Sequence, residues 1–225
     1  MSRIMIIGGH GKVALLAAPL LVAAGHDVVS LIRDPAQVPD VAATGATPLV
    51  LSVEEADVTD LTRAFAGADA VVWSAGAAGK GGPQRTDAVD RAAAIRSMEA
   101  ATAAGVRRYV MVSFMSAYGD VAEDHPLRAY AIAKIAADRH LQGTGLDWTI
   151  LGPGRLTLEE PSGAIAVERV AEGGDNYTSR GNVARVIAAV LAEPASIGRV
   201  IPFHDGAVPI AEAVANVPPE YSDLS

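Results

Sequence analysis

The chain has 225 residues, of which 50% are hydrophobic, and its 18 lysines and arginines against 26 acidic residues leave a formal net charge of −8. This length and apolar content predict one domain, residues 1–225, with a single core. Nucleic acids and anionic membranes both require a positive protein surface, and no cluster of lysine and arginine is present. The composition therefore favours small-molecule partners.

The chain contains no cysteine, which excludes disulfides, thiolate catalysis and cysteine zinc sites. The histidines do not show the spacing of metal ligands, so we expect no metal site; they are His10, His26, His125, His140 and His204. The strand-like start does not resemble a signal peptide, and no apolar run is long enough to span a membrane. We expect a cytoplasmic protein, either a monomer or a homodimer.

Short apolar runs alternate with longer alanine-rich stretches, a pattern typical of repeated βα units around a parallel sheet. The predicted strands are 3–8, 27–33, 46–51, 69–75, 107–113, 147–152 and 197–203. The predicted helices are 11–24, 36–44, 57–66, 85–104, 127–142, 180–192 and 209–216. A glycine follows five of the helices, where a left-handed C-cap is expected: Gly25, Gly45, Gly67, Gly105 and Gly145. This alternation predicts an α/β protein with a doubly wound parallel sheet, the Rossmann fold.

A glycine-rich turn follows the first predicted strand and opens the first helix. Its spacing is Gly8-x-x-Gly11-x-x-Ala14. Gly8 allows the tight turn, Gly11 lets the backbone approach a phosphate, and Ala14 stands where a third glycine often permits close helix packing. This position indicates a dinucleotide site, with Lys12 as a candidate cation beside the phosphate.

The end of the second strand predicts which cofactor binds. About 20 residues beyond the glycine turn, an acidic residue holds the ribose of NAD, whereas an arginine accommodates the 2′-phosphate of NADP. Arg33 occupies this position, and a guanidinium pairs well with phosphate. Asp34 follows immediately and is the alternative, either by restraining Arg33 or by taking the NAD role. We expect NADP(H) to be preferred over NAD(H).

Tyr130 and Lys134 are four residues apart on a predicted helix and therefore share one face. A phenol with a pKa near 10 is a poor proton donor at neutral pH. An adjacent ammonium favours the phenolate, so we expect Lys134 to lower the pKa of Tyr130 toward the working pH.

Together these motifs resemble the atypical, extended-type short-chain dehydrogenases/reductases, in their NAD(P)H-binding and NAD-dependent epimerase/dehydratase-like branch. The matching pieces are the glycine turn, Arg33, Ala75-Gly76, Ser113, Tyr130-x-x-x-Lys134, the segment 146–154, and the stretch 179–184 that opens a late helix. The chain departs from the branch in having Ala14 for the third glycine, Gly152 for arginine and Asn182 for aspartate. These departures leave the predicted fold intact but put the substrate class in doubt.

The resemblance implies that Tyr130 is the general acid or base, that Lys134 holds the nicotinamide ribose and tunes the phenol, and that a serine polarises the substrate carbonyl. Ser113 is favoured for this last role over Ser116. The cofactor side is expected to comprise Gly8, His10, Gly11, Lys12, Val13, Arg33, Val53, Ala75, Gly76, Lys134 and Pro153. Residues about 114–126 and 153–180 are expected to shape the substrate side.

The predicted function is hydride transfer between NADP(H) and a small carbonyl or hydroxyl compound, including possible epimerase or dehydratase chemistry. The alternatives are an NADP(H)-binding redox sensor with little turnover, and a flavin- or biliverdin-type reductase that does not require the tyrosine. The acidic residues Asp57, Asp60, Asp87 and Asp90 are interpreted as helix-start and solvent-facing groups.

Overall fold

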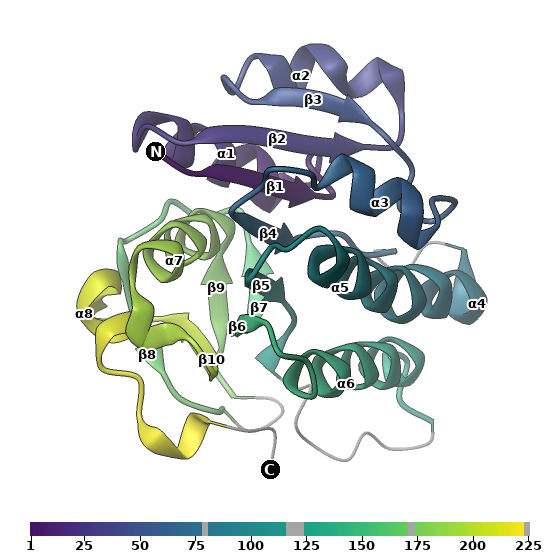
Figure 1. The fold of residues 1–225 in the computed structure, drawn as a ribbon. Coiled ribbons are helices and arrows are strands. Elements are labelled where there is room, and N and C mark those ends of the chain that lie inside the picture. Colours follow the sequence, from purple (N-terminus) through teal and green to yellow (C-terminus); the bar gives the residue numbers. More distant parts are fainter. Residues whose placement is uncertain (78–80, 116–123, 171–173, 223–225) are drawn as a thin grey trace.

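The computed structural model describes residues 1–77, 81–115, 124–170 and 174–222. A nine-stranded sheet runs through the molecule in the order β11-β8-β10-β6-β5-β4-β1-β2-β3 (Figure 1). Its parallel strands are β1 (Arg3–Ile7), β2 (Asp27–Ile32), β3 (Thr47–Val50), β4 (Ala70–Trp73), β5 (Arg108–Val112), β6 (Asp147–Pro153) and β10 (Arg199–Asp205). The order β3-β2-β1-β4-β5-β6 is that of a Rossmann fold, which confirms the predicted fold class.

The segments after β6 add four short strands. β8 (Ala164–Val167) joins the edge of the main sheet antiparallel to β10, and β11 (Val208–Pro209) pairs with β8. β7 (Arg155–Thr157) and β9 (Tyr177–Ser179) form a separate parallel pair. This pair lies in one of the two segments expected to face substrate.

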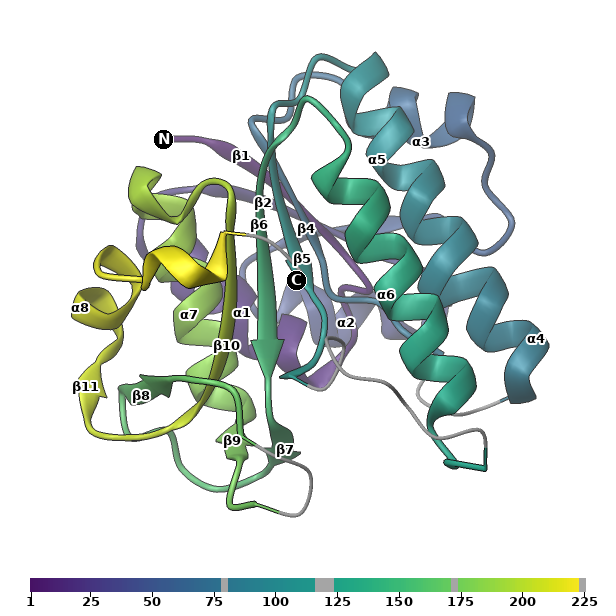
Figure 2. The same ribbon diagram turned by 90° about the horizontal axis from the view of Figure 1, so that it is seen from below.

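Helices cover both faces of the sheet, as Figure 2 shows. The helices are α1 (Lys12–Ala23), α2 (Val38–Ala42), α3 (Val58–Ala64), α4 (Gly82–Thr86), α5 (Ala94–Ala103), α6 (Arg128–Gln142), α7 (Arg180–Ala192) and α8 (Ile210–Ala215). Side chains alternate along β1, so that Ile4 and Ile6 pack toward α1 and α7, whereas Met5 and Ile7 pack toward α3, α5 and α6. Burial on both sides explains why the strands are continuous apolar runs rather than alternating ones.

The parallel register brings the carboxyl ends of β1, β2 and β4 to one edge of the sheet. Ile7 pairs with Leu31 on one side and with Trp73 on the other. The residues that follow these strands therefore meet in one crevice, which is where ligands bind in open α/β sheets.

Two of the predicted helical features are wrong in detail. The predicted helix 85–104 is instead α4, a π-helical segment (Asp87–Ala93) and α5. Four of the five predicted glycine caps have positive φ, but Gly145 does not. The helix before it ends at Gln142, and its C-cap Gly143 keeps a right-handed φ of −78°. The chain therefore reaches β6 without a left-handed glycine.

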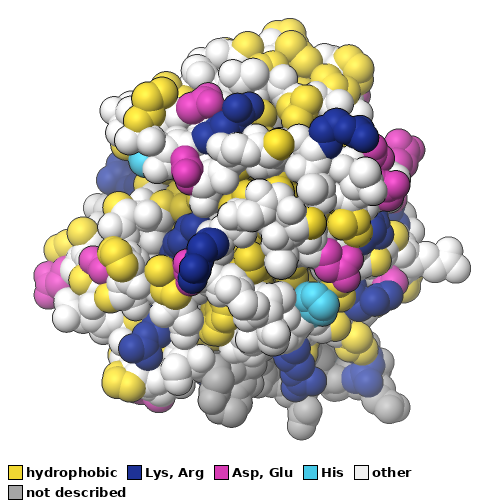
Figure 3. All heavy atoms as spheres, in the orientation of Figure 1, with side chains coloured by type: hydrophobic (Ala, Val, Ile, Leu, Met, Phe, Trp, Pro, Cys, Tyr) yellow, Lys and Arg dark blue, Asp and Glu magenta, His cyan; other side chains and the backbone are white. Residues whose placement is uncertain are grey.

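Among the residues described, no helix is both long enough and apolar enough to cross a membrane. In the same part of the chain, no three His, Asp or Glu side chains are grouped as metal ligands would be. On the face drawn in Figure 3, lysine and arginine side chains are scattered among acidic ones.

Candidate active site

The glycine turn between β1 and α1 is closed so tightly that side chains do not fit at its first positions. Gly8 has φ of +79°, and a Cβ there would lie 2.7 Å from the backbone Cα of Ala75. A Cβ on Gly9 would lie 2.5 Å from the Cβ of Ser30. The Gly11 N–H donates to Gly8 O at 2.8 Å and closes the turn. Glycine is required here by both backbone conformation and close approach.

The N-terminus of α1 can receive an anion. Gly11 is its N-cap, and no side chain from the described ranges caps the helix. The first backbone N–H groups of a helix have no intrahelical partner and carry the positive end of the helix dipole. The sequence predicts a pyrophosphate at this position, and helix N-termini bind such anions.

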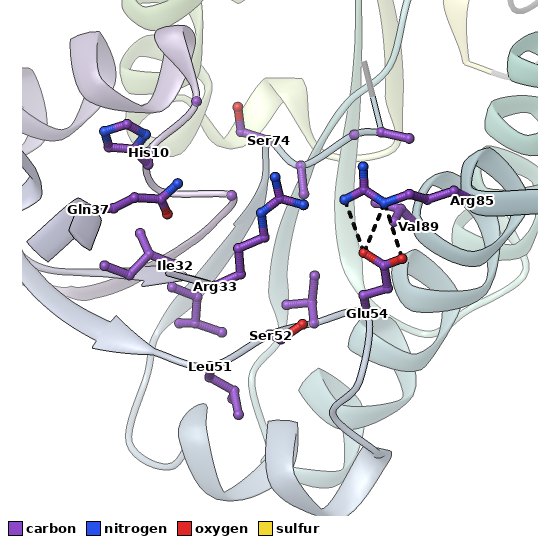
Figure 4. A pocket seen from close by; sticks show the side chains of 17 residues that line it. His10, Ile32, Arg33, Gln37, Leu51, Ser52, Glu54, Ser74, Arg85 and Val89 are labelled. Carbon is purple, nitrogen blue, oxygen red and sulfur yellow. Dashed lines mark hydrogen bonds and ion pairs between the residues drawn. The ribbon is translucent and has the colours of Figure 1, made fainter. Parts of the chain in front are cut away.

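A pocket opens beside this turn, at the carboxyl ends of the parallel strands (Figure 4). Seven of the predicted cofactor residues line it: Gly8, His10, Gly11, Arg33, Val53, Ala75 and Gly76. The other four lie outside this lining. Lys12 is exposed and Val13 is 7% exposed in the core, while Lys134 belongs to α6 and Pro153 ends β6.

Among the residues described, Arg33 is a free cation of the pocket. Its side chain reaches into the pocket in Figure 4, and within the described ranges it has no hydrogen bond or ion pair. Asp34 does not restrain it, because Asp34 Oδ1 accepts from the Ala36 N–H at 2.9 Å and caps a short 3₁₀ turn. His10, on the same side, is held by Asp40 at 2.8 Å.

A bidentate ion pair crosses the pocket on the other side. Arg85 of α4 donates from Nη2 to Glu54 Oε2 at 3.1 Å and from Nε to Glu54 Oε1 at 3.2 Å. Arg96 fixes the loop that carries Glu54, since it donates to the carbonyls of Val53 and Glu54. Sequence reasoning missed this pair, because its members are far apart in the chain.

Tyr130 and Lys134 share a face of α6, as predicted. Lys134 Nζ lies 5.8 Å from the centre of the Tyr130 ring. Phe114 also packs against Tyr130, with the two ring centres 5.0 Å apart. The expected pKa shift of Tyr130 is wrong in sign. Burial raises the pKa of the phenol more than the Lys134 ammonium lowers it, and the nearby carboxylates of Asp90 and Asp138 raise it further.

The Lys134 ammonium is held inside the molecule by a carboxylate and a backbone carbonyl. Its side chain is 3% exposed, its Nζ lies 3.5 Å from Asp90 Oδ1, and it donates to Val112 O at 3.2 Å. Burial lowers the pKa of Lys134, but Tyr130, Asp90 and Asp138 raise it by more, so the ammonium stays charged.

Asp90 connects this lysine to the cofactor pocket. The Ala77 N–H donates to Asp90 Oδ2 at 3.0 Å, and Ala77 lines the pocket. Asp90 lies in the π-helical segment and is fully buried, so its interpretation as a solvent-facing residue is wrong. Its contact with Lys134 spans 44 positions of sequence, which no local pattern reveals.

Asp138 is a second buried carboxylate on the Lys134 side. Ser113 Oγ donates to Asp138 Oδ2 at 2.5 Å, while Asp138 Oδ1 has no hydrogen-bond partner in the part of the chain that the structure describes. Burial raises the pKa of Asp138 to about 7, against the opposing effects of Ser113 and Lys134. Tyr130, Lys134 and Asp138 follow at i, i+4 and i+8, a spacing that could have indicated this residue. Ser116, the alternative polarising serine, lies outside the described residues.

The model of the NAD(P)H-binding family matches residues 8–194. The chain belongs to this family. The matched span contains the glycine turn, the pocket and α6, and the family is that of NAD(P)-dependent oxidoreductases and epimerases.

Individual relatives extend over nearly all of the chain. The UPF0659 protein C216.03 of Schizosaccharomyces pombe is 35% identical and covers 96% of this chain and 94% of its own length. The uncharacterized sugar epimerase YhfK of Bacillus subtilis is 30% identical, and the match covers 94% of this chain and 98% of the relative. A solved structure from Bacillus halodurans, assigned to the NAD-dependent epimerases/dehydratases, has a TM-score of 0.86 at 32% identity. The match covers 95% of this chain and 99% of that structure's chain. These matches place the chain in the predicted branch of atypical short-chain dehydrogenases/reductases.

Proposed function

We propose that this protein binds NADP(H) in the pocket beside the glycine turn and catalyses hydride transfer to or from a small carbonyl or hydroxyl compound. The bound nicotinamide supplies or accepts the hydride. The chain supplies the cradle for the phosphates, the proton at the substrate oxygen and the exclusion of water.

The preference for NADP(H) is supported by Arg33. Its guanidinium is unpaired in the part of the chain that the structure describes, and it reaches into the pocket at the end of β2. Asp34, the residue that could have favoured NAD, is committed to a turn. A planar fork of donors recognises a phosphate better than a ribose hydroxyl.

Tyr130 is proposed as the group that gives its phenolic proton to the substrate oxygen, or takes it in the reverse direction. The observation that carries this proposal is the buried chain of contacts from the pocket to the phenol. The Ala77 N–H binds Asp90, Asp90 lies against Lys134, and the Lys134 ammonium lies beside the Tyr130 ring. The ammonium stabilises the phenolate that remains after proton transfer.

The substrate side is proposed to comprise the described parts of residues 114–126 and 153–180. These two segments meet where the Val170 N–H donates to Met115 Sδ at 3.5 Å. Redox epimerisation of a hydroxyl-bearing carbon is a second candidate, because it needs the same hydride and proton transfers and a 30% identical relative is described as a sugar epimerase.

The test measures NADPH oxidation against a panel of aldehydes, ketones, quinones and flavins, with sugar nucleotides assayed separately for epimerisation. Tyr130→Phe keeps the ring but removes the acid, so carbonyl turnover should fall by about 10²-fold with NADPH affinity nearly unchanged. Lys134→Met should weaken both. Tyr221→Phe, a tyrosine outside the site, serves as the control.

Each alternative function has its own outcome in this experiment. Full turnover of flavins or tetrapyrroles in Tyr130→Phe would support a reductase that does not use the phenol. Tight NADPH binding without turnover of any compound would support a redox sensor.

A further inference from the structure

Three ionisable side chains lie together in the closed space between β5, the π-helical segment and α6. Asp90 and Asp138 are both 0% exposed, and Lys134 is 2% exposed. If all three were ionised, this water-excluded cluster would carry one uncompensated negative charge. Such a charge is costly to bury, and a buried carboxyl commonly takes up a proton instead.

The contacts distinguish the two carboxyls. Asp90 accepts the Ala77 N–H at Oδ2, and its Oδ1 lies 3.5 Å from the Lys134 ammonium, so each of its oxygens has a donor or a cation beside it. Within the described residues, Asp138 has one hydrogen bond, to the Ser113 hydroxyl, and its Oδ1 has none. A hydroxyl can either donate or accept, so Ser113 is compatible with both protonation states of Asp138.

The remaining neighbours of Asp138 do not compensate its charge. From its own helix Lys134 and Tyr130 interact with it, and from β5 Tyr109 does, while Asp90 of the π-helical segment contacts the same Lys134. The apolar cluster on this side of the sheet includes Met98 of α5 and Ile150 of β6. Arg85 of α4 is already paired with Glu54.

We propose that Asp138 is a positioning residue that holds a proton in the resting protein and thereby sets the direction of the Ser113 hydrogen bond. A proton on Oδ2 is donated to Ser113 Oγ, which leaves the hydroxyl hydrogen of Ser113 free to donate elsewhere. When Asp138 ionises, Oδ2 captures that hydrogen. A proton on Oδ1 would be an unpaired buried donor, so Oδ2 is the favoured position.

The consequence for catalysis rests on the proposed function: the Ser113 hydroxyl can donate its hydrogen to a substrate oxygen only while Asp138 is protonated. Ser113 is suitably placed for this, since its neighbour Val112 accepts from Lys134 and its neighbour Phe114 packs on Tyr130. The raised pKa of Asp138, about 7, places the change of direction near neutral pH.

Infrared spectroscopy of the ligand-free full chain tests the inference without any substrate. The carbonyl stretch of a protonated buried carboxyl lies apart from the carboxylate bands, and we expect one such band to titrate near neutral pH. Asp138→Asn should remove it. Asp90→Asn should keep it, because the proton is assigned to Asp138. A band that survives in Asp138→Asn, or disappears in Asp90→Asn, would overturn the inference.

The variant Ser113→Ala tests the hydrogen bond while leaving Asp138 in place, and it decides the question even if Asp138→Asn does not fold. The hydroxyl stabilises the ionised carboxylate, so its removal should move the midpoint to higher pH. An unchanged midpoint would show that Ser113 and Asp138 are not coupled. Absence of turnover on the substrate panel would count against the proposed function but would not alter these spectra.

The pH dependence of kcat/KM then tests the consequence for catalysis. In wild type, kcat/KM should fall as pH rises through the midpoint of the infrared band. Asp138→Asn presents a permanent amide donor to Ser113, so this limb of the profile should flatten. An unchanged limb would assign Asp138 a structural role only.

Discussion

Lys134 and Asp90 form an ion pair, with Nζ 3.5 Å from Oδ1, in which the two side chains are 3% and 0% exposed. One member belongs to the proposed proton-transfer pair, and the other binds the backbone of the loop that lines the cofactor pocket. The two halves of the site are therefore joined through a single buried carboxylate.

Removal of this charge should destabilise the protein and weaken cofactor binding. Asp90→Asn leaves the Lys134 ammonium without its partner, and breaking a buried pair should lower the free energy of unfolding by about 3 kcal/mol. Urea unfolding at neutral pH and NADPH fluorescence titration measure the two effects. Asp87→Asn is the matched control, since Asp87 lies in the same segment but pairs with Arg91 at the surface, where such a pair contributes less than about 1 kcal/mol. Equal losses in the two variants would contradict the role assigned to Asp90.

Cofactor choice should depend on Arg33. Arg33→Ala should weaken NADPH binding by about 1.5–3 kcal/mol, the usual contribution of charged hydrogen bonds, and should leave NADH binding nearly unchanged. Calorimetric titration of both cofactors measures this. Arg63→Ala, at an exposed arginine of α3, controls for the loss of one positive charge. Equal affinities for the two cofactors in wild type would refute the NADP(H) preference.

The glycine turn should not tolerate a methyl group at position 8. Gly8 and Gly25 both have positive φ, but only at Gly8 would a Cβ meet backbone atoms, whereas nothing lies within 4 Å at Gly25. Gly25→Ala should cost about 1 kcal/mol of stability from backbone strain alone. Gly8→Ala should cost about 2 kcal/mol more and should abolish measurable NADPH binding, because β1 and the loop after β4 must separate. Thermal unfolding and titration of both variants give the comparison, and similar behaviour of the two would argue against close approach at the turn.

Stability should respond to pH through Asp138. Its folded-state pKa, about 7, exceeds its ordinary value of 3.8, so the folded protein binds more protons than the unfolded chain between these values. The contribution of Asp138 to stability is therefore fully present at acidic pH, falls as pH rises toward 7 and is constant above it. Relative to Asp138→Asn, wild type should lose on the order of 2–4 kcal/mol between about pH 4 and pH 8. Parallel unfolding curves at several pH values measure the difference, and a constant difference would contradict the raised pKa.

Much of the architecture could be predicted because it depends on local pattern. Strand and helix order follow from the alternation of apolar runs with alanine-rich stretches. Because crossover connections between parallel strands are right-handed, few topologies are compatible with that order. The glycine turn, Arg33 and the pair Tyr130 and Lys134 were found for the same reason. Each is a short spacing whose geometry is set by one turn, one strand end or one helix.

The sequence by itself therefore determined the Rossmann fold, the dinucleotide cradle and the face of α6 that carries the phenol. Only the tertiary structure decided that Asp90 is buried, that it binds both Ala77 and Lys134, and that Ser113 and Asp138 share a hydrogen bond. Burial and pKa depend on atoms brought from β4, β5, the π-helical segment and α6 into one space. Such a sum of distant contacts has no local period, and this is why the sign of the Tyr130 shift could not be read from the lysine one helical turn away.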